Sequence, residues 1–154
     1  AHSLSLRKES PTVVLLPSGL GKIYPESLSY WTSMILEKGG ALVSEYRDDQ
    51  EMQRHHFLAR NRLIAGLGIA TLVIEARKKS GTLITARQAM EQGKPVLVLP
   101  SHPLDNKARG GLDLICEGAT PIRDAEDLCV FLQSEILGVF TSPTPLGLGS
   151  KHSH

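Results

Sequence analysis

Four short apolar runs, separated by segments of helical periodicity, constrain the fold of this chain more than any other feature. They cover residues 12–16, 41–44, 71–75 and 95–99, and each is rich in Val, Leu and Ile with little alternation of polar and apolar positions. That pattern is typical of strands that are buried on both faces of a sheet. A further short strand is expected at residues 120–122.

Helical segments alternate with these runs. Residues 26–38, 57–67, 82–92 and 125–137 show apolar positions at helical spacing. Ser80 or Gly81 is expected to cap the helix at 82–92, and Gly93 to end it. Because strands that alternate with helices form βαβ units, we expect an α/β domain of three layers: a Rossmann-like parallel sheet with helices on both faces.

Length and composition fit one domain with a core of its own, since the chain has 154 residues, of which 41% are hydrophobic and 21% charged. Residues 1–10 have the pattern of the end of a helix, and 141–154 hold Pro, Gly and Ser without periodicity. We therefore expect a folded domain over 1–140 and a disordered tail over 141–154.

Several classes of protein and ligand find no support. The N-terminal residues have no apolar core of signal-peptide type, and no apolar run approaches the roughly 20 residues that a membrane span needs. Cys116 and Cys129 do not have the spacing of metal ligands. We expect a cytoplasmic protein with reduced thiols, no cofactor and no membrane partner.

The charge distribution points to a polyanion. Between Arg54 and Lys94 the chain has eight cations and two acids, although its overall net charge is only +1. A local excess of this kind is typical of a surface that binds phosphate groups, and solvated helix faces are the alternative interpretation.

Small and basic residues follow two of the expected strands, at the sheet edge where α/β proteins bind ligands. Ser18 and Gly19 follow the first run, and residues 77–82 follow the third. Gly81 lets a backbone approach a ligand, and Ser80, Thr82 and the first N–H groups of the next helix can hold a phosphate. Neither turn is a dinucleotide fingerprint or a Walker A motif.

Two arginines flank Asn61 near the expected start of the helix at 57–67. Arg60 and Arg62 would oppose the helix dipole there, and a bound anion would offset that cost. His56 and Phe57 can stack on a base. No nucleophile, base and orienting group can be assigned from spacing, so we do not expect an enzyme. An ion pair with a nearby Arg is the expected role of Glu45.

Several motifs in one collinear order resemble the DNA-processing protein A (DprA/Smf) family over about residues 12–122. They are Ser-Gly-Leu at 18–20, Ile-Tyr-Pro at 23–25, Ser-Glu-Tyr at 44–46, His-Phe at 56–57, Arg-Asn-Arg-Leu-Ile-Ala-Gly-Leu at 60–67, Val-Ile-Glu-Ala at 73–76, Ser-Gly-Thr-Leu-Ile-Thr-Ala at 80–86, Val-Leu-Pro at 98–100, and Leu-Ile and Gly-Ala at 114–115 and 118–119.

The resemblance implies a Rossmann-like domain that binds single-stranded DNA, usually as a homodimer, and loads a RecA-type recombinase onto incoming strands during natural transformation. It implies binding rather than catalysis. With the charge and strand-end arguments, it gives a set of candidate binding residues: Ser18, Gly19, Phe57, Arg60, Asn61, Arg62, Arg77, Lys79, Ser80, Gly81 and Thr82.

The family's domain begins with two strands and a glycine-rich loop that have no counterpart here, so the resemblance implies a domain truncated at its N-terminus. Two alternatives stay open. One is a Rossmann-like binder of nucleotides or nucleotide derivatives, against which stands the absence of the Pro-Gly-Gly-x-Gly-Thr-x-x-Glu motif of phosphoribohydrolases. The other is a degenerate fragment without binding of its own.

Overall fold

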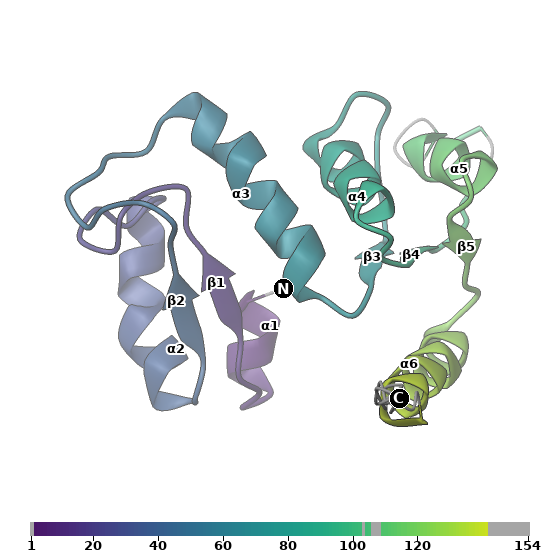
Figure 1. Ribbon diagram of the computed structural model, residues 1–154, viewed down its shortest axis with the longest axis horizontal. Coiled ribbons are helices and arrows are strands. Elements are labelled where there is room, and N and C mark those ends of the chain that lie inside the picture. The colour runs from purple at the N-terminus through teal and green to yellow at the C-terminus, as the bar shows by residue number, and fades with distance from the viewer. Residues whose placement is uncertain (1, 103, 106–108, 142–154) are drawn as a thin grey trace, which may run out of the picture.

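Among the residues that the structure describes, five short strands form two parallel sheets (Figure 1). The computed structural model describes residues 2–102, 104, 105 and 109–141. In the first sheet β1 (Val13–Leu15) pairs with β2 (Ala41–Val43), in the register Val13 with Ala41. In the second sheet β4 (Val96–Val98) lies between β3 (Thr71–Val73) and β5 (Thr120–Pro121).

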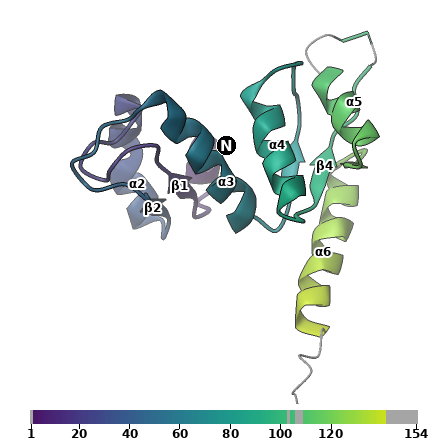
Figure 2. The same cartoon turned by 45° about the horizontal axis from the view of Figure 1, so that its top comes forward.

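Helices separate the strands along the chain, and the expected α/β fold with a parallel sheet is confirmed. They are α1 (His2–Arg7), the 3-10 helix η1 (Glu26–Trp31), α2 (Thr32–Glu37), α3 (Arg54–Leu67), α4 (Gly81–Glu91), α5 (Arg109–Cys116) and α6 (Ala125–Thr141). In Figure 1, α3 lies between the two sheets, and Figure 2 shows α6 extending away from the rest of the molecule.

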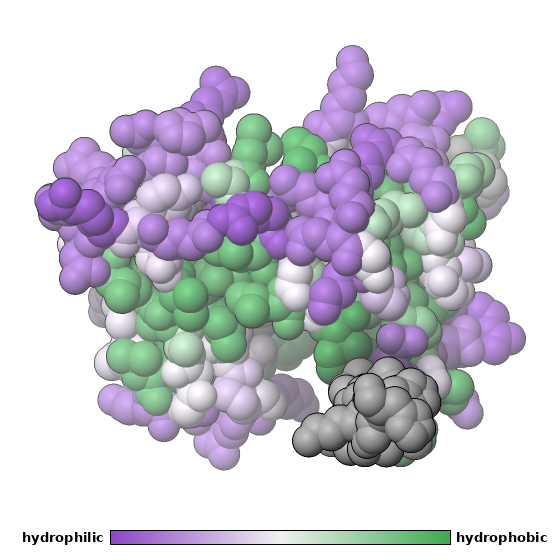
Figure 3. Space-filling model, in the orientation of Figure 1, coloured by the Kyte–Doolittle hydropathy of each residue, from purple (hydrophilic) through white to green (hydrophobic). Residues whose placement is uncertain are grey.

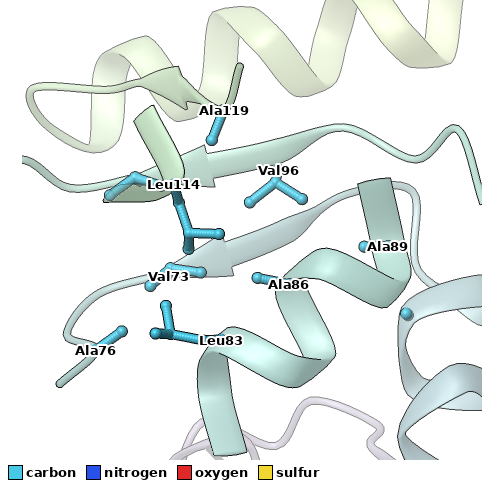
Figure 4. Packing of buried hydrophobic residues seen from close by; sticks show 10 residues of the cluster. Val73, Ala76, Leu83, Ala86, Ala89, Val96, Leu114 and Ala119 are labelled. Carbon is cyan, nitrogen blue, oxygen red and sulfur yellow. The ribbon is translucent and has the colours of Figure 1, made fainter. Parts of the chain in front are cut away.

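Each sheet has its own hydrophobic core. The larger one is built on β3 and β4, where Val73 and Val98 pack with Leu83 and Ala86 of α4 and with Leu114 of α5 (Figure 4). Small residues on α4 let the helix lie close to the sheet, since Ala86 and Ala89 are fully buried. The smaller core joins α1, β1 and α2 through Leu6, Val14, Leu16 and Ile35.

The expectation that every apolar run is buried on both faces is correct only for β4, all of whose residues are buried. On β1, Val13 is 55% exposed, and on β3, Leu72 is 39% exposed. The physical reason is the interrupted sheet. Within the described residues, β1 pairs only with β2 and β3 only with β4, so one edge of each strand has no neighbouring strand.

Several expected boundaries are wrong by a turn or less. The helix expected at 57–67 begins at Arg54, because Gln53 and His56 form a reciprocal capping box at its N-terminus. The single helix expected at 26–38 is divided into η1 and α2. The expected disordered tail included Thr141, which belongs to α6, and its remaining residues, 142–154, lie outside the described part of the chain.

Candidate nucleic-acid interface

Helices α3 and α4 run parallel and begin at the same edge of the molecule, where β1 and β3 end. The side chain of Gln88 donates to the carbonyl of Leu58 (3.5 Å), and Gln92, one turn later, donates to that of Arg62 (3.0 Å). Donors and acceptors advance in the same order, so the two helix N-termini, with their positive dipole ends, are neighbours. Hydrophilic side chains protrude along this upper edge in Figure 3.

A tight basic turn connects β3 to α4. The backbone N–H of Ser80 donates to the carbonyl of Arg77 (3.1 Å), and Lys79 has a φ of 62°, in the left-handed region. Lys78 lies 3.9 Å from Asp113 and is engaged in that ion pair. Arg77 and Lys79 are exposed and form no ion pair with any residue that the structure describes. Two cations thus remain available in front of the helix that follows.

The first turn of α4 presents unused donors. Ser80 is the N-cap residue, as expected, but its hydroxyl makes no capping bond, and the buried Oγ has no hydrogen-bond partner within the described residues. The N–H groups of Gly81 and Thr82 precede the intrahelical bonding pattern and have no acceptor in the helix. A side chain at Gly81 would meet nothing within 4 Å. An anion can therefore approach the N–H groups of Gly81 and Thr82 closely.

Arg60 faces inward and joins α3 to the unpaired edge of β1. Its Nη1 donates to the carbonyl of Leu15 (2.7 Å), and its Nε lies 3.3 Å from Oδ1 of Asn61. Its Cζ lies 5.6 Å from the centre of the Phe57 ring. Burial lowers the pKa of the Arg60 guanidinium, which still stays charged at neutral pH. Arg60 thus has a structural role besides any contact with a ligand.

Arg62 is engaged by an acid from the neighbouring loop. Its Nη2 donates to both carboxylate oxygens of Glu45, the residue expected to pair with an arginine. Both side chains remain partly exposed, so the pair is screened by solvent. Because the charges of Arg62 and Glu45 are opposite and in contact, Arg62 adds less positive potential to the edge than an unpaired arginine would.

Ser18 and Gly19 lie below the surface rather than at it. The carbonyl of Ser18 accepts a bond from the Ser44 hydroxyl (2.7 Å), and the N–H of Gly19 donates to the carbonyl of Gln50 (2.9 Å). A Cβ on Gly19 would lie 1.9 Å from the carbonyl oxygen of Arg47. In this structure the two residues hold the loop after β1 against the loop after β2.

The suggestion that His56 stacks on a base is wrong, because its ring is buried, with 2% of the residue exposed. Its Nδ1 lies 2.9 Å from the carbonyl oxygen of Pro17 and 3.2 Å from the backbone nitrogen of Gln53. The ring of Tyr46 stacks on it at 4.0 Å between centroids. Phe57 is half-buried, and the structure adds a residue that the sequence reasoning did not select, Tyr24, whose ring meets Phe57 edge to face at 5.8 Å.

Fold and site together define a Rossmann-like α/β domain with a cationic edge at the carboxyl ends of its strands. A family model described as DNA recombination-mediator protein A matches residues 1–133, and the chain belongs to this family.

Relatives of known name agree with that assignment. The chain is 39% identical over 134 residues to protein Smf of Escherichia coli (strain K12), covering 86% of this chain and 36% of that protein. It is 38% identical over 129 residues to DNA processing protein DprA of Bacillus subtilis (strain 168), covering 83% of this chain and 43% of the relative. The chain therefore spans less than half the length of these relatives.

Two solved structures show the same fold. DNA processing protein A from Streptococcus pneumoniae superposes with a TM-score of 0.72 at 34% identity, over 84% of this chain and 46% of that one. A structure of DNA processing protein A from Helicobacter pylori, reported for its single-stranded DNA binding mode, gives a TM-score of 0.67 at 31% identity, over 80% and 56% of the two chains.

The described part of the chain lacks two further features, a membrane-spanning helix and a cluster of metal ligands. None of its helices combines the length and apolar character that crossing a membrane demands. Its His, Cys, Asp and Glu side chains form no group of three or more that could hold a metal ion.

Proposed function

We propose that this chain binds single-stranded DNA through the strand's phosphate groups and acts as a recombination mediator of the DprA/Smf type, by binding rather than by catalysis. Family membership supports the proposal, as does the single-stranded DNA binding reported for the H. pylori relative. The observation that carries it is the turn at Arg77–Ser80, where two cations without an ion-pair partner among the described residues precede a helix N-terminus with unused N–H donors.

The residues divide into two groups under this proposal. Arg77 and Lys79 supply charge to a phosphodiester, while the N–H groups of Gly81 and Thr82 supply directed donors at the positive end of α4. Arg60 is already bonded to the carbonyl of Leu15, and Arg62 to Glu45. Under this proposal they position the edge and add positive electrostatic potential.

The wider role belongs to the same proposal. The family resemblance supports three further parts of the proposal: a RecA-type recombinase as partner, a homodimer as the working state and a cytoplasmic location. The phosphate-binding edge would hold the DNA strand that the recombinase receives.

Gly81→Ala tests the proposed phosphate site. The extra methyl group has space in the protein, so the variant should be more stable by about 0.5 kcal/mol in urea unfolding, because alanine favours the helix. It should nevertheless bind a fluorescent oligo(dT) several-fold more weakly, because the methyl group occupies the approach to the N–H donors.

Gly138→Ala on α6 is the matched control, since a Cβ there also meets nothing within 4 Å. It should gain stability and bind the oligonucleotide like the unaltered chain. Equal affinity in the two variants would contradict the placement of the phosphate at Gly81. A chain that binds nucleoside monophosphates but no oligonucleotide would instead support the nucleotide-binding alternative.

A further inference from the structure

Among the described residues, two arginines are paired with a glutamate, and the two pairs differ in how the guanidinium is used. Arg87 donates to Glu117 from both Nε (2.9 Å) and Nη2 (2.7 Å), which is the bidentate geometry that a planar guanidinium favours. Arg62 donates to both carboxylate oxygens of Glu45 from Nη2 alone. Its Nε and Nη1 have no acceptor within the described part of the chain. Arg62 is therefore held while two of its nitrogens stay free.

The Glu45 carboxylate stands at the proposed phosphate edge, on a loop whose backbone is fixed. Glu45 is the second residue after β2, beyond the carboxyl end of that strand. The hydroxyl of Ser44 donates to the carbonyl of Ser18 (2.7 Å) and accepts the N–H of Tyr46 (2.9 Å). Glu117, in contrast, lies three residues before β5, at the amino ends of the parallel strands. Of the two pairs, only that of Glu45 lies on the side of the sheet where the DNA is proposed to bind.

A phosphodiester of the DNA competes with the Glu45 carboxylate for the same guanidinium. Both anions accept charge-assisted hydrogen bonds from arginine in the same bidentate manner. The free Nε and Nη1 let a phosphate contact Arg62 before the bond to Glu45 breaks. Both side chains are partly exposed, so water solvates the released carboxylate, and breaking the pair costs little free energy. Arg62 can thus pass from the carboxylate to a phosphate.

We propose that Glu45 is an internal competitor of the DNA strand: it holds Arg62 in the free protein and yields this arginine to a phosphate of the bound strand. The inference rests on the proposed binding of single-stranded DNA and adds a contact that limits its affinity. Each binding event breaks the ion pair, so the pair weakens binding of every strand, whatever its base sequence.

Glu45→Gln is the test, because glutamine keeps the size of the side chain and removes its charge. The variant should bind oligo(dT) about threefold more tightly than the unaltered chain, in keeping with the small free energy of an exposed ion pair. A gain in affinity cannot come from a loss of folding. Glu117→Gln is the matched control, since it removes the same charge from a similarly exposed pair at the other edge of the sheet. It should bind like the unaltered chain.

The same substitution in an Arg62→Ala background separates competition from a general effect of charge. At about 0.15 M salt the gain from Glu45→Gln should be lost there, because no guanidinium is left to release and charges more than about 8 Å apart are screened. Arg62→Ala alone should lower the slope of log affinity against log salt by about 0.7, because one phosphate contact is removed. Fluorescence anisotropy titrations at several salt concentrations measure both quantities.

The failures can be told apart. An affinity of Glu45→Gln equal to or below that of the unaltered chain would show that Glu45 does not compete with the DNA. A gain that persists without Arg62, or that Glu117→Gln shares, would show that the carboxylate acts through its charge alone. Either result would overturn this inference and leave the proposed function in place. No binding of any oligonucleotide by the unaltered chain or by Glu45→Gln would overturn the proposed function and this inference together.

Discussion

Replacing Arg77 and Lys79 together by alanine should lower the affinity of this chain for oligo(dT) by roughly 30-fold at low salt. Each cation interacts with a phosphate about 4 Å away by about 1 kcal/mol in water, and about 2 kcal/mol corresponds to roughly 30-fold. The loss should be the same for all base sequences, because phosphates carry no sequence information. Fluorescence anisotropy titrations at several salt concentrations measure both effects.

The slope of log affinity against log salt should also fall, by about 0.7 for each phosphate contact removed. A double alanine variant of Arg87 and Lys94 is the control, since it removes the same charge. Arg87 is already paired with Glu117, the residue after α5, and Lys94 follows the far end of α4. An equal loss in both double variants would mean that overall charge, and not the turn before α4, governs binding.

Gly19→Ala should cause the largest loss of stability, about 3 kcal/mol or more in the free energy of unfolding. The new Cβ would lie 1.9 Å from the carbonyl oxygen of Arg47 and 2.6 Å from that of Asp48. Both obstacles are backbone atoms, so neither can move aside like the end of a flexible side chain. The loops after β1 and β2 would have to separate, which would also break the bond from Gly19 N–H to Gln50.

Urea unfolding followed by circular dichroism measures this loss, with Gly138→Ala again as the variant that removes a glycine without a clash. An unfolding midpoint for Gly19→Ala equal to that of the unaltered chain would show that the two loops do not pack as described. In that case Gly19 would be open to a ligand, as its place in the sequence first suggests.

The strands and most helices could be predicted from the sequence, because apolar runs and helical periodicity are local signals. Helix α5 could not. It contains the pair Gly110 and Gly111, which disfavours a helix in isolation. Packing explains why position 110 is a glycine: a Cβ on Gly110 would lie 2.8 Å from the carbonyl oxygen of Ala76. A glycine is favoured in α5 only because this helix approaches the chain after β3 so closely.

The cationic edge was likewise visible in the sequence, but the state of each cation was not. Arg60 turns inward to the carbonyl of Leu15, and Arg62 is engaged by Glu45. These partners lie far away in the chain, so only the folded arrangement distinguishes a structural arginine from an available one. The exposure of Val13 and Leu72 could not be predicted for the same reason, since burial depends on which strands are neighbours.

Amide chemical shifts in a titration with oligo(dT) test the location of the phosphate site most directly. With ¹⁵N-labelled protein, we expect the signals of Ser80, Gly81 and Thr82 to move most and to saturate together, while those of β5 and α6 stay in place. Binding with the largest shifts on β5 or α6, and none at the start of α4, would contradict it.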